Sequence, residues 1–332
     1  MISQGIGELF MLGFQGPTVP GWLREFATRF GLGGVILFDY DYQAKTYDNN
    51  IQSPEQVRKL CAELSALPSH PLILVDQEGG KVRRLKEKLG FAPLPSAQAF
   101  AAMPLSEREL LLRNSFREMR SLGFHFDLAP VVDLNLNPRN PDIGAVERSY
   151  SADLSIVREN ARLVDKIARE TKLGLCLKHY PGLGSATTNS HLSLTDVTAT
   201  LTEAEEEIFY ELGAEVYGGA ILLSHAFVRQ WDQENPVSLS LSAVARLRSR
   251  LPDALLLTDD LQMQGLQQIC HTREGCRRAL HAGIDWLVIG NNLLREEKEL
   301  AGIAEDLARD PSLTKAIETA IARIRRRKQL FA

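Results

Sequence analysis

Eight short apolar segments recur along the chain, and longer amphipathic segments separate them. Each apolar segment has the length expected of a strand that is buried on both faces, and the intervening segments have helical spacing of their apolar residues. Strands and helices that alternate in this way predict an α/β fold, a (β/α)8 TIM barrel forming a single domain over residues 1–332. The expected strands are residues 9–14, 34–38, 72–75, 124–128, 173–177, 220–223, 254–257 and 286–289.

Four of the intervening segments carry clear helix patterns. Residues 53–67 begin with Ser53, which can accept hydrogen bonds as an N-cap, followed by Pro54 at the first helical position. Residues 154–171 and 202–216 are amphipathic. In residues 106–122, we expect one apolar face formed by Leu110, Leu111, Phe116 and Met119.

Polar and charged residues follow most of the expected strands directly. In a barrel the carboxyl ends of all strands meet at one mouth, whereas in a doubly wound open sheet they line only a crevice. Periodicity alone does not exclude the open sheet, but six polar segments placed in step favour the barrel. A mouth rich in carboxylates, cations and imidazoles suits a small polyhydroxylated ligand. The six segments are residues 76–84, 133–150, 178–179, 224–225, 258–260 and 291–292.

Some of these residues also have purely structural explanations. Asp260 precedes a possible helix and could be its N-cap, and Arg83 and Arg84 could lie on a solvated helix face. The Gly79-Gly80 pair predicts a tight turn. His125 alternates with apolar neighbours within an expected strand, so we interpret it as structural.

Composition narrows the possible partners. The chain has 332 residues, of which 44% are hydrophobic and 24% charged, with a net charge of −4, which gives no electrostatic reason to expect nucleic acid or an anionic membrane. The four cysteines form no CxxC pair, and no histidines and carboxylates have metal-ligand spacing, so we expect no disulfide, metal or cofactor. We find neither a signal peptide nor a membrane-spanning run and expect a cytoplasmic protein. The oligomeric state stays open.

Four motifs in order resemble those of the family 3 glycoside hydrolases. They are VDQEGGKVRRL, IGAVERSY, KHYPGLGSATTNSH and TDDLQM, and the similarity extends over nearly the whole chain. More narrowly, the chain is similar to the single-domain bacterial β-N-acetylhexosaminidases that trim cell-wall fragments. The resemblance implies a barrel with its site at the C-terminal mouth and a retaining mechanism through a covalent glycosyl-enzyme.

The resemblance also implies roles for individual residues. Asp259 corresponds to the nucleophile, and a carboxylate near cations would remain ionised as that role requires. His191 corresponds to a histidine that acts as acid/base from the loop after the fifth strand. The residues that correspond to the family's sugar-binding positions are Asp76, Arg84, Arg148, Lys178 and His179.

The loop that carries His191 departs from the family pattern, which is close to KHFPGHGDTxxDSH. Leu183 replaces a histidine, Ser185 replaces an aspartate, and Asn189 replaces the aspartate that pairs with the catalytic histidine. An asparagine can bind the imidazole ring but cannot stabilise its charged form. We therefore expect weakened acid assistance, unless Asp196 or an acid from another loop substitutes.

The sequence thus predicts an exo-acting hexosaminidase that releases terminal N-acetylglucosamine from a small carbohydrate substrate, such as a peptidoglycan fragment. The sequence is also compatible with three alternative functions. The altered loop is compatible with a sugar-binding paralogue that hydrolyses little, or with a phosphorylase in which phosphate replaces water. A barrel aldolase with Lys178 as a Schiff base would require that lysine to be desolvated among apolar walls.

Overall fold

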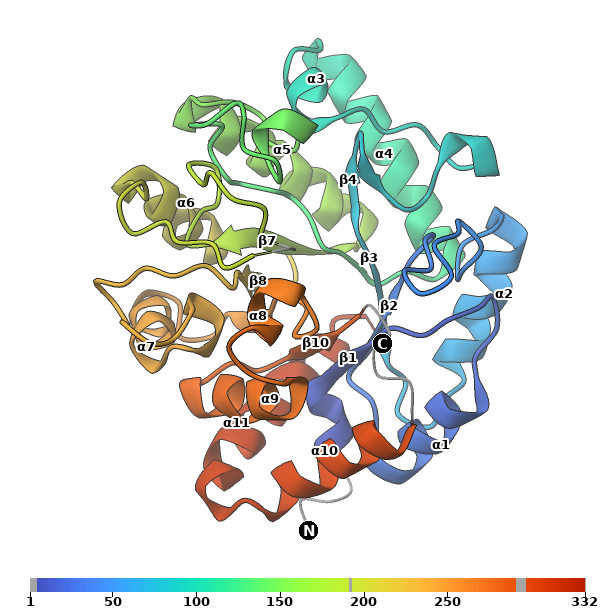
Figure 1. Cartoon of the computed structure of the whole chain (residues 1–332). Coiled ribbons are helices and arrows are strands. Elements are labelled where there is room, and N and C mark those ends of the chain that lie inside the picture. Colours follow the sequence, from blue (N-terminus) through green and yellow to red (C-terminus); the bar gives the residue numbers. More distant parts are fainter. Residues whose placement is uncertain (1–4, 191–192, 291–296, 332) are drawn as a thin grey trace.

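The computed structural model describes residues 5–190, 193–290 and 297–331. Eight parallel strands form a barrel at the centre, and helices surround it (Figure 1). The strands are neighbours in the order β10-β1-β2-β3-β6-β7-β8-β9. Their bounds are β1 Phe10–Leu12, β2 Gly34–Leu37, β3 Leu72–Val75, β6 Phe126–Asp127, β7 Gly174–Tyr180, β8 Ala220–Leu223, β9 Leu255–Thr258 and β10 Leu287–Ile289.

The two ends of this strand order also meet. Leu257 and Trp286 form a parallel bridge, and the Thr258 amide donates a 3.1 Å hydrogen bond to the Trp286 carbonyl. The sheet therefore closes on itself, as predicted, and is not a doubly wound open sheet. All eight predicted strands are present, although β7 continues three residues past its predicted end, through Lys178 and His179 to Tyr180.

Helices follow the strands in turn along the chain. Ser53 caps α2 as expected, because its side chain accepts from the Gln56 amide, and α6 ends at Gly213 rather than at the predicted residue 216. The helices are α1 Gly21–Phe30, α2 Pro54–Ser65, α3 Ala97–Ala101, α4 Leu105–Leu122, α5 Leu154–Thr171, α6 Glu203–Gly213, α7 Leu241–Arg250, α8 Gln264–Gln267, α9 Thr272–Ala282, α10 Glu297–Arg309 and α11 Thr314–Lys328.

The predicted apolar face of α4 is wrong in one respect. Leu110 is 59% exposed, whereas Leu112, Phe116 and Met119 are buried. Residues spaced by three and four positions share one face of a helix, and Leu110 is two positions from Leu112, so it lies on the opposite side.

The amino end of the barrel is filled by side chains. Trp286, which directly precedes β10, is fully buried and reaches Gly34 on β2, where a Cβ atom would lie 2.5 Å from the indole ring. Only glycine leaves room for this indole, which crosses the interior from one strand to another. Trp286 thus fills part of the barrel interior at the amino ends of the strands, opposite the end where their carboxyl termini lie.

A short hairpin follows β3 and was not predicted as strands. It comprises β4 Gln77–Gly79 and β5 Val82–Arg83, and the predicted turn at Gly79-Gly80 connects them. Gly79 and Gly80 both have positive φ, and a Cβ on Gly79 would lie 2.0 Å from the Pro95 carbonyl oxygen. The hairpin therefore depends on glycine at this turn.

None of the helices in the described ranges combines the length and the apolar character needed to cross a membrane.

Candidate active site

A cavity of about 200 Å³ lies at the carboxyl ends of the barrel strands. Six of the residues that the sequence assigned to the site line it, although they come from four separate segments of the chain. These residues are Asp76, Arg84, Arg148, Lys178, His179 and Asp259.

Lys178 lies at the centre of this charged group, between two carboxylates. Its Nζ atom is 2.8 Å from Asp76 Oδ1 and 2.7 Å from Glu78 Oε1. Burial alone would lower the pKa of Lys178, but the two carboxylates outweigh this effect and raise the pKa above its ordinary value. Lys178 is therefore a fixed cation. A Schiff-base lysine must become a neutral amine, so this environment argues against the aldolase alternative.

The two carboxylates are correspondingly held as anions. Burial would raise the pKa of Asp76, but Lys178 and Arg84 outweigh burial and hold it below its usual range. Burial would also raise the pKa of Glu78, but the nearby Arg148 and Lys178 outweigh burial and lower this pKa to about 2. Both carboxylates are ionised at neutral pH and can accept hydrogen bonds.

Arg148 makes a two-pronged ion pair with Glu78. Its Nε and one terminal nitrogen each donate a 2.7 Å hydrogen bond to the carboxylate. Its other terminal nitrogen donates to the Asp142 carbonyl at 2.9 Å. These contacts fix the guanidinium plane at the cavity wall, with the geometry that favours arginine over lysine.

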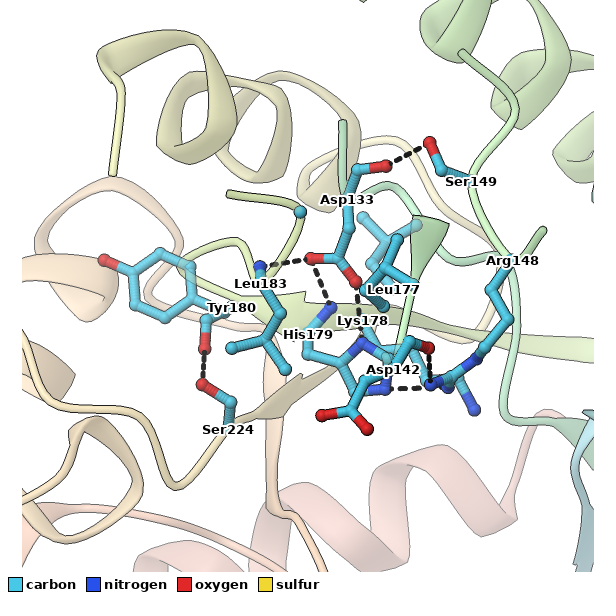
Figure 2. Close-up of polar contacts among 12 residues, drawn as sticks. Asp133, Asp142, Arg148, Ser149, Leu177, Lys178, His179, Tyr180, Leu183 and Ser224 are labelled. Atoms are coloured by element: carbon cyan, nitrogen blue, oxygen red, sulfur yellow. Dashed lines mark hydrogen bonds and ion pairs between the residues drawn. The ribbon is translucent and has the colours of Figure 1, made fainter. Parts of the chain in front are cut away.

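His179 lies between Arg148 and a buried aspartate, as Figure 2 shows. Its Nδ1 is 2.7 Å from Asp133 Oδ2, and its Nε2 is 3.1 Å from Arg148. Asp133 is fully buried and also accepts a 2.8 Å hydrogen bond from the Leu183 amide. The peptide bond between Lys178 and His179 is cis, and both side chains lie at the cavity.

Arg84 also points to the cavity. It lies 3.3 Å from Asp76 and 3.9 Å from Asp39, and Gln77 fixes its backbone by accepting from the Arg84 amide at 3.0 Å. Arg84 therefore does not lie on a solvated helix face, which was the structural alternative for this residue. Arg83 belongs to β5, where it pairs with Glu87, and is not on a helix either.

Asp259 follows β9 directly, at the carboxyl end of the strand. Its amide donates to the Leu223 carbonyl at 2.9 Å, and its Oδ1 accepts from the Asp260 amide at 2.8 Å. Asp260 does not cap a helix, since α8 begins at Gln264 with Met263 as its N-cap. Instead, its side chain accepts from the Gln262 amide at 2.9 Å and holds the turn after the strand.

With this geometry in place, comparison with known proteins is decisive about the family. The family described as "Glycosyl hydrolase family 3 N terminal domain" matches residues 1–326. The chain belongs to glycosyl hydrolase family 3. It is therefore a glycoside hydrolase, an enzyme that acts on O-glycosyl bonds.

Individual relatives agree with this assignment. The hydrolase is 30% identical to the "Beta-hexosaminidase" of Thiobacillus denitrificans over 83% of this chain and 76% of that protein. It is 29% identical to the "Beta-hexosaminidase" of Pseudomonas aeruginosa PAO1 over 87% of this chain and 84% of the relative.

Solved structures share the fold. A family 3 β-N-acetylglucosaminidase from Paenibacillus sp. matches with a TM-score of 0.86 and 27% identity, over 100% of this chain and 63% of that chain. This hydrolase thus spans less than two thirds of that structure. A β-N-acetylhexosaminidase from Beutenbergia cavernae matches with a TM-score of 0.85 and 24% identity, over 99% and 98% of the two chains, and this similarity concerns the fold alone.

Residues 181–190, which follow β7, reach the cavity in the hydrolase. Leu183 and Ser190 line the cavity, and the Ser190 amide donates a 2.6 Å hydrogen bond to Asp142 Oδ2. Asn189 is half-buried, and its carbonyl accepts from the Ser193 amide at 3.0 Å. The predicted acid/base His191 lies outside the described residues. Asp196, considered as a substitute carboxylate, pairs with Arg229 at 2.7 Å on the surface.

Several carboxylates in and beneath the site, Asp39 beside Arg84 among them, were not assigned from the sequence. Glu78, Asp133 and Asp142 bind Arg148, His179 and the loop at Ser190, as described above. Charge balance could have indicated them, because three predicted cations faced only two predicted carboxylates at a buried site. Buried cations require partners, so at least one further acid was to be expected near Lys178 and Arg148.

Proposed function

We propose that this hydrolase releases terminal β-linked N-acetylglucosamine through a covalent intermediate on Asp259, and that cell-wall fragments are its substrates. The observation that carries this proposal is that Asp259 shares one cavity with the charged residues Asp76, Arg84, Arg148 and Lys178. The relatives named β-hexosaminidase support the choice of an N-acetylhexosamine as the sugar.

The cavity suits one terminal sugar. The strand residues Ile36, Leu222 and Val288 line its inner side, so we expect a bound ring to extend outward. Asp76 can accept from sugar hydroxyls while Lys178 and Arg84 donate to them, and each of these groups is held by ion pairs in advance. A site built in this way favours exo action on the end of a chain.

In the proposed reaction, an Asp259 oxygen forms a bond to the anomeric carbon while the bond from that carbon to the leaving oxygen breaks. The leaving oxygen takes up a proton, which we assign to His191 from the sequence motif alone. Water then attacks the anomeric carbon, releases Asp259 and returns a proton to the acid/base group. The two displacements together retain the anomeric configuration.

The test compares initial rates on the 4-nitrophenyl β-glycosides of N-acetylglucosamine and of glucose, with and without phosphate. We expect the N-acetylglucosaminide to react at least about tenfold faster, because an enzyme specific for N-acetylhexosamines, as the relatives are named, discriminates against a sugar that lacks the acetamido group. We expect no dependence on phosphate. Equal rates on both sugars would contradict the proposed specificity, and a requirement for phosphate would identify a phosphorylase.

A further inference from the structure

Three tyrosines form a cluster on the loop between β2 and α2, beside the mouth of the cavity. The ring of Tyr40 lies 4.9 Å, between centroids, from both Tyr42 and Tyr47. Tyr42 is 48% exposed and Tyr47 is 61% exposed. Exposed aromatic residues gathered beside a binding cavity are typical of an additional contact surface.

The loop that carries this cluster is held firmly. The Asn50 side chain is fully buried, where it accepts from the Phe38 amide at 3.0 Å and donates to the carbonyls of Phe14 and Gly16. The Asn49 side chain donates to the Tyr40 carbonyl at 3.1 Å. These bonds fix the backbone on both sides of the cluster, so the rings are positioned before any ligand binds.

The tip of the loop is a closed turn. Asp41 and Thr46 form an antiparallel bridge, and Asp41 Oδ1 accepts from the Gln43 and Ala44 amides at 2.8 and 3.0 Å. Tyr42 is the first residue of this turn, and the bridge at its base holds it at the rim.

The cluster is continuous with the cavity. Tyr42 itself lines the cavity together with Asp259 and Arg84. Burial raises the pKa of the Tyr42 hydroxyl, and the charges of Arg84 and Asp76 also act on it, while 48% of the residue remains exposed.

A second connection runs through a buried carboxylate. Asp39 is 2% exposed and pairs with both Arg84 and Lys86. The Lys86 ammonium in turn lies 3.9 Å from the centroid of the Tyr47 ring. The residues that would hold the terminal sugar and the tyrosine cluster therefore form one preorganised surface.

We propose that the tyrosine cluster, with Tyr42 as its principal contact, binds the leaving-group sugar of the substrate. A pyranose ring has an apolar face of C–H groups and a polar edge, which matches an aromatic ring bordered by cations. A terminal sugar in the cavity must direct its glycosidic oxygen outward, so the next ring lies at the rim beside Tyr42. This inference rests on the proposed function and adds the position of the second sugar to it.

The test measures kcat/KM for two substrates that share the terminal N-acetylglucosamine, its methyl β-glycoside and its β-1,4-linked disaccharide. Both leaving groups are alcohols, so the substrates differ chiefly in the second ring. We expect Tyr42→Ala to lower kcat/KM for the disaccharide about tenfold more than for the methyl glycoside, as the loss of one aromatic contact predicts. Tyr42→Phe retains the ring and should preserve most of the preference.

Leu110→Ala is the control, because Leu110 is exposed on α4 outside the cavity lining, and both rates should stay unchanged. Equal losses on both substrates for Tyr42→Ala, or no loss on either, would overturn the inference. In either case, a wild-type enzyme that still prefers N-acetylglucosaminides would leave the proposed function standing. A wild-type enzyme that hydrolyses neither substrate nor the nitrophenyl N-acetylglucosaminide would contradict the proposed function itself.

Discussion

The Nε2 atom of His179 lies 3.1 Å from a terminal nitrogen of the Arg148 guanidinium. Arginine can only donate hydrogen bonds, so Nε2 must accept, and the proton of a neutral imidazole therefore lies on Nδ1. That nitrogen faces Asp133 Oδ2 at 2.7 Å, where it can donate. Both ring nitrogens are thus engaged by the protein, and we expect His179 to orient Arg148 rather than to transfer the proton in catalysis.

This arrangement predicts that lysine cannot replace Arg148. Arg148→Lys retains the charge but loses the two-pronged bond to Glu78 and the contact with His179. We expect affinity for free N-acetylglucosamine to fall by about tenfold or more, the effect of one or two lost charge-assisted hydrogen bonds, in a calorimetric titration. Arg113→Lys, at a half-exposed ion pair on α4, serves as control. Unchanged affinity in Arg148→Lys would remove Arg148 from the binding site.

Lys178 is predicted to be essential for stability as well as for binding. Lys178→Met leaves the Asp76 and Glu78 carboxylates without the cation they share, which should lower the free energy of unfolding at pH 7 by about 3 kcal/mol. The pKa values of both carboxyls are lowered in the folded protein, so the stability they contribute is present above the ordinary carboxyl pKa and is lost as pH falls. The difference between variant and wild type in urea unfolding should therefore narrow as pH falls from about 5 to about 2. A difference that widens over this range would contradict the assignment.

The pKa of Asp127 is shifted in the opposite direction from those of Asp76 and Glu78. Burial raises the pKa of Asp127 to about 7, and its Oδ1 accepts from the Gln77 amide at 2.9 Å. The folded state therefore binds a proton on the Asp127 carboxyl more tightly than the unfolded chain does. The protonated carboxyl contributes its full free energy of stabilisation below the ordinary carboxyl pKa, and this contribution is lost as pH rises through about 7.

Asparagine keeps the acceptor at this position without the charge. Asp127→Asn should therefore raise the free energy of unfolding at pH 8 relative to wild type and change it much less at pH 5. Urea unfolding at the two pH values measures this difference. An equal effect of the substitution at pH 5 and pH 8 would show that Asp127 does not titrate in this range.

The strands and the position of the site could be predicted from the sequence because both depend on local patterns. A strand buried on both faces is a continuous apolar run, and the polar residues that follow parallel strands converge wherever the sheet closes. The pairing of charges could not be predicted in the same way. Glu78 meets Arg148 across 70 positions of sequence, on a hairpin whose shape depends on the contact between Gly79 and Pro95. The exposed Leu110 and the turn at Asp260 show that helix phase and helix starts are also decided by tertiary packing.

The altered loop predicts a rate pattern that depends on the leaving group. Nitrophenol departs without a proton, whereas a sugar alcohol requires one, so weak acid assistance should disfavour natural substrates. Asn189→Asp restores the carboxylate of the family motif. It should raise turnover of the β-linked disaccharide of N-acetylglucosamine by about tenfold more than turnover of the nitrophenyl glycoside. If the ratio of the two rates does not change, the acid acts independently of position 189.

The central claim is that Asp259 forms a bond to the sugar, and mass spectrometry of rapidly quenched enzyme tests it most directly. With the nitrophenyl N-acetylglucosaminide in excess, we expect an adduct with the mass of one N-acetylhexosaminyl group on the peptide that contains Asp259. Fragmentation should place the adduct on Asp259 and not on the adjacent Asp260, and Asp259→Asn should abolish both adduct and turnover. An adduct on Asp260, or an Asp259→Asn enzyme that retains wild-type turnover, would contradict the account.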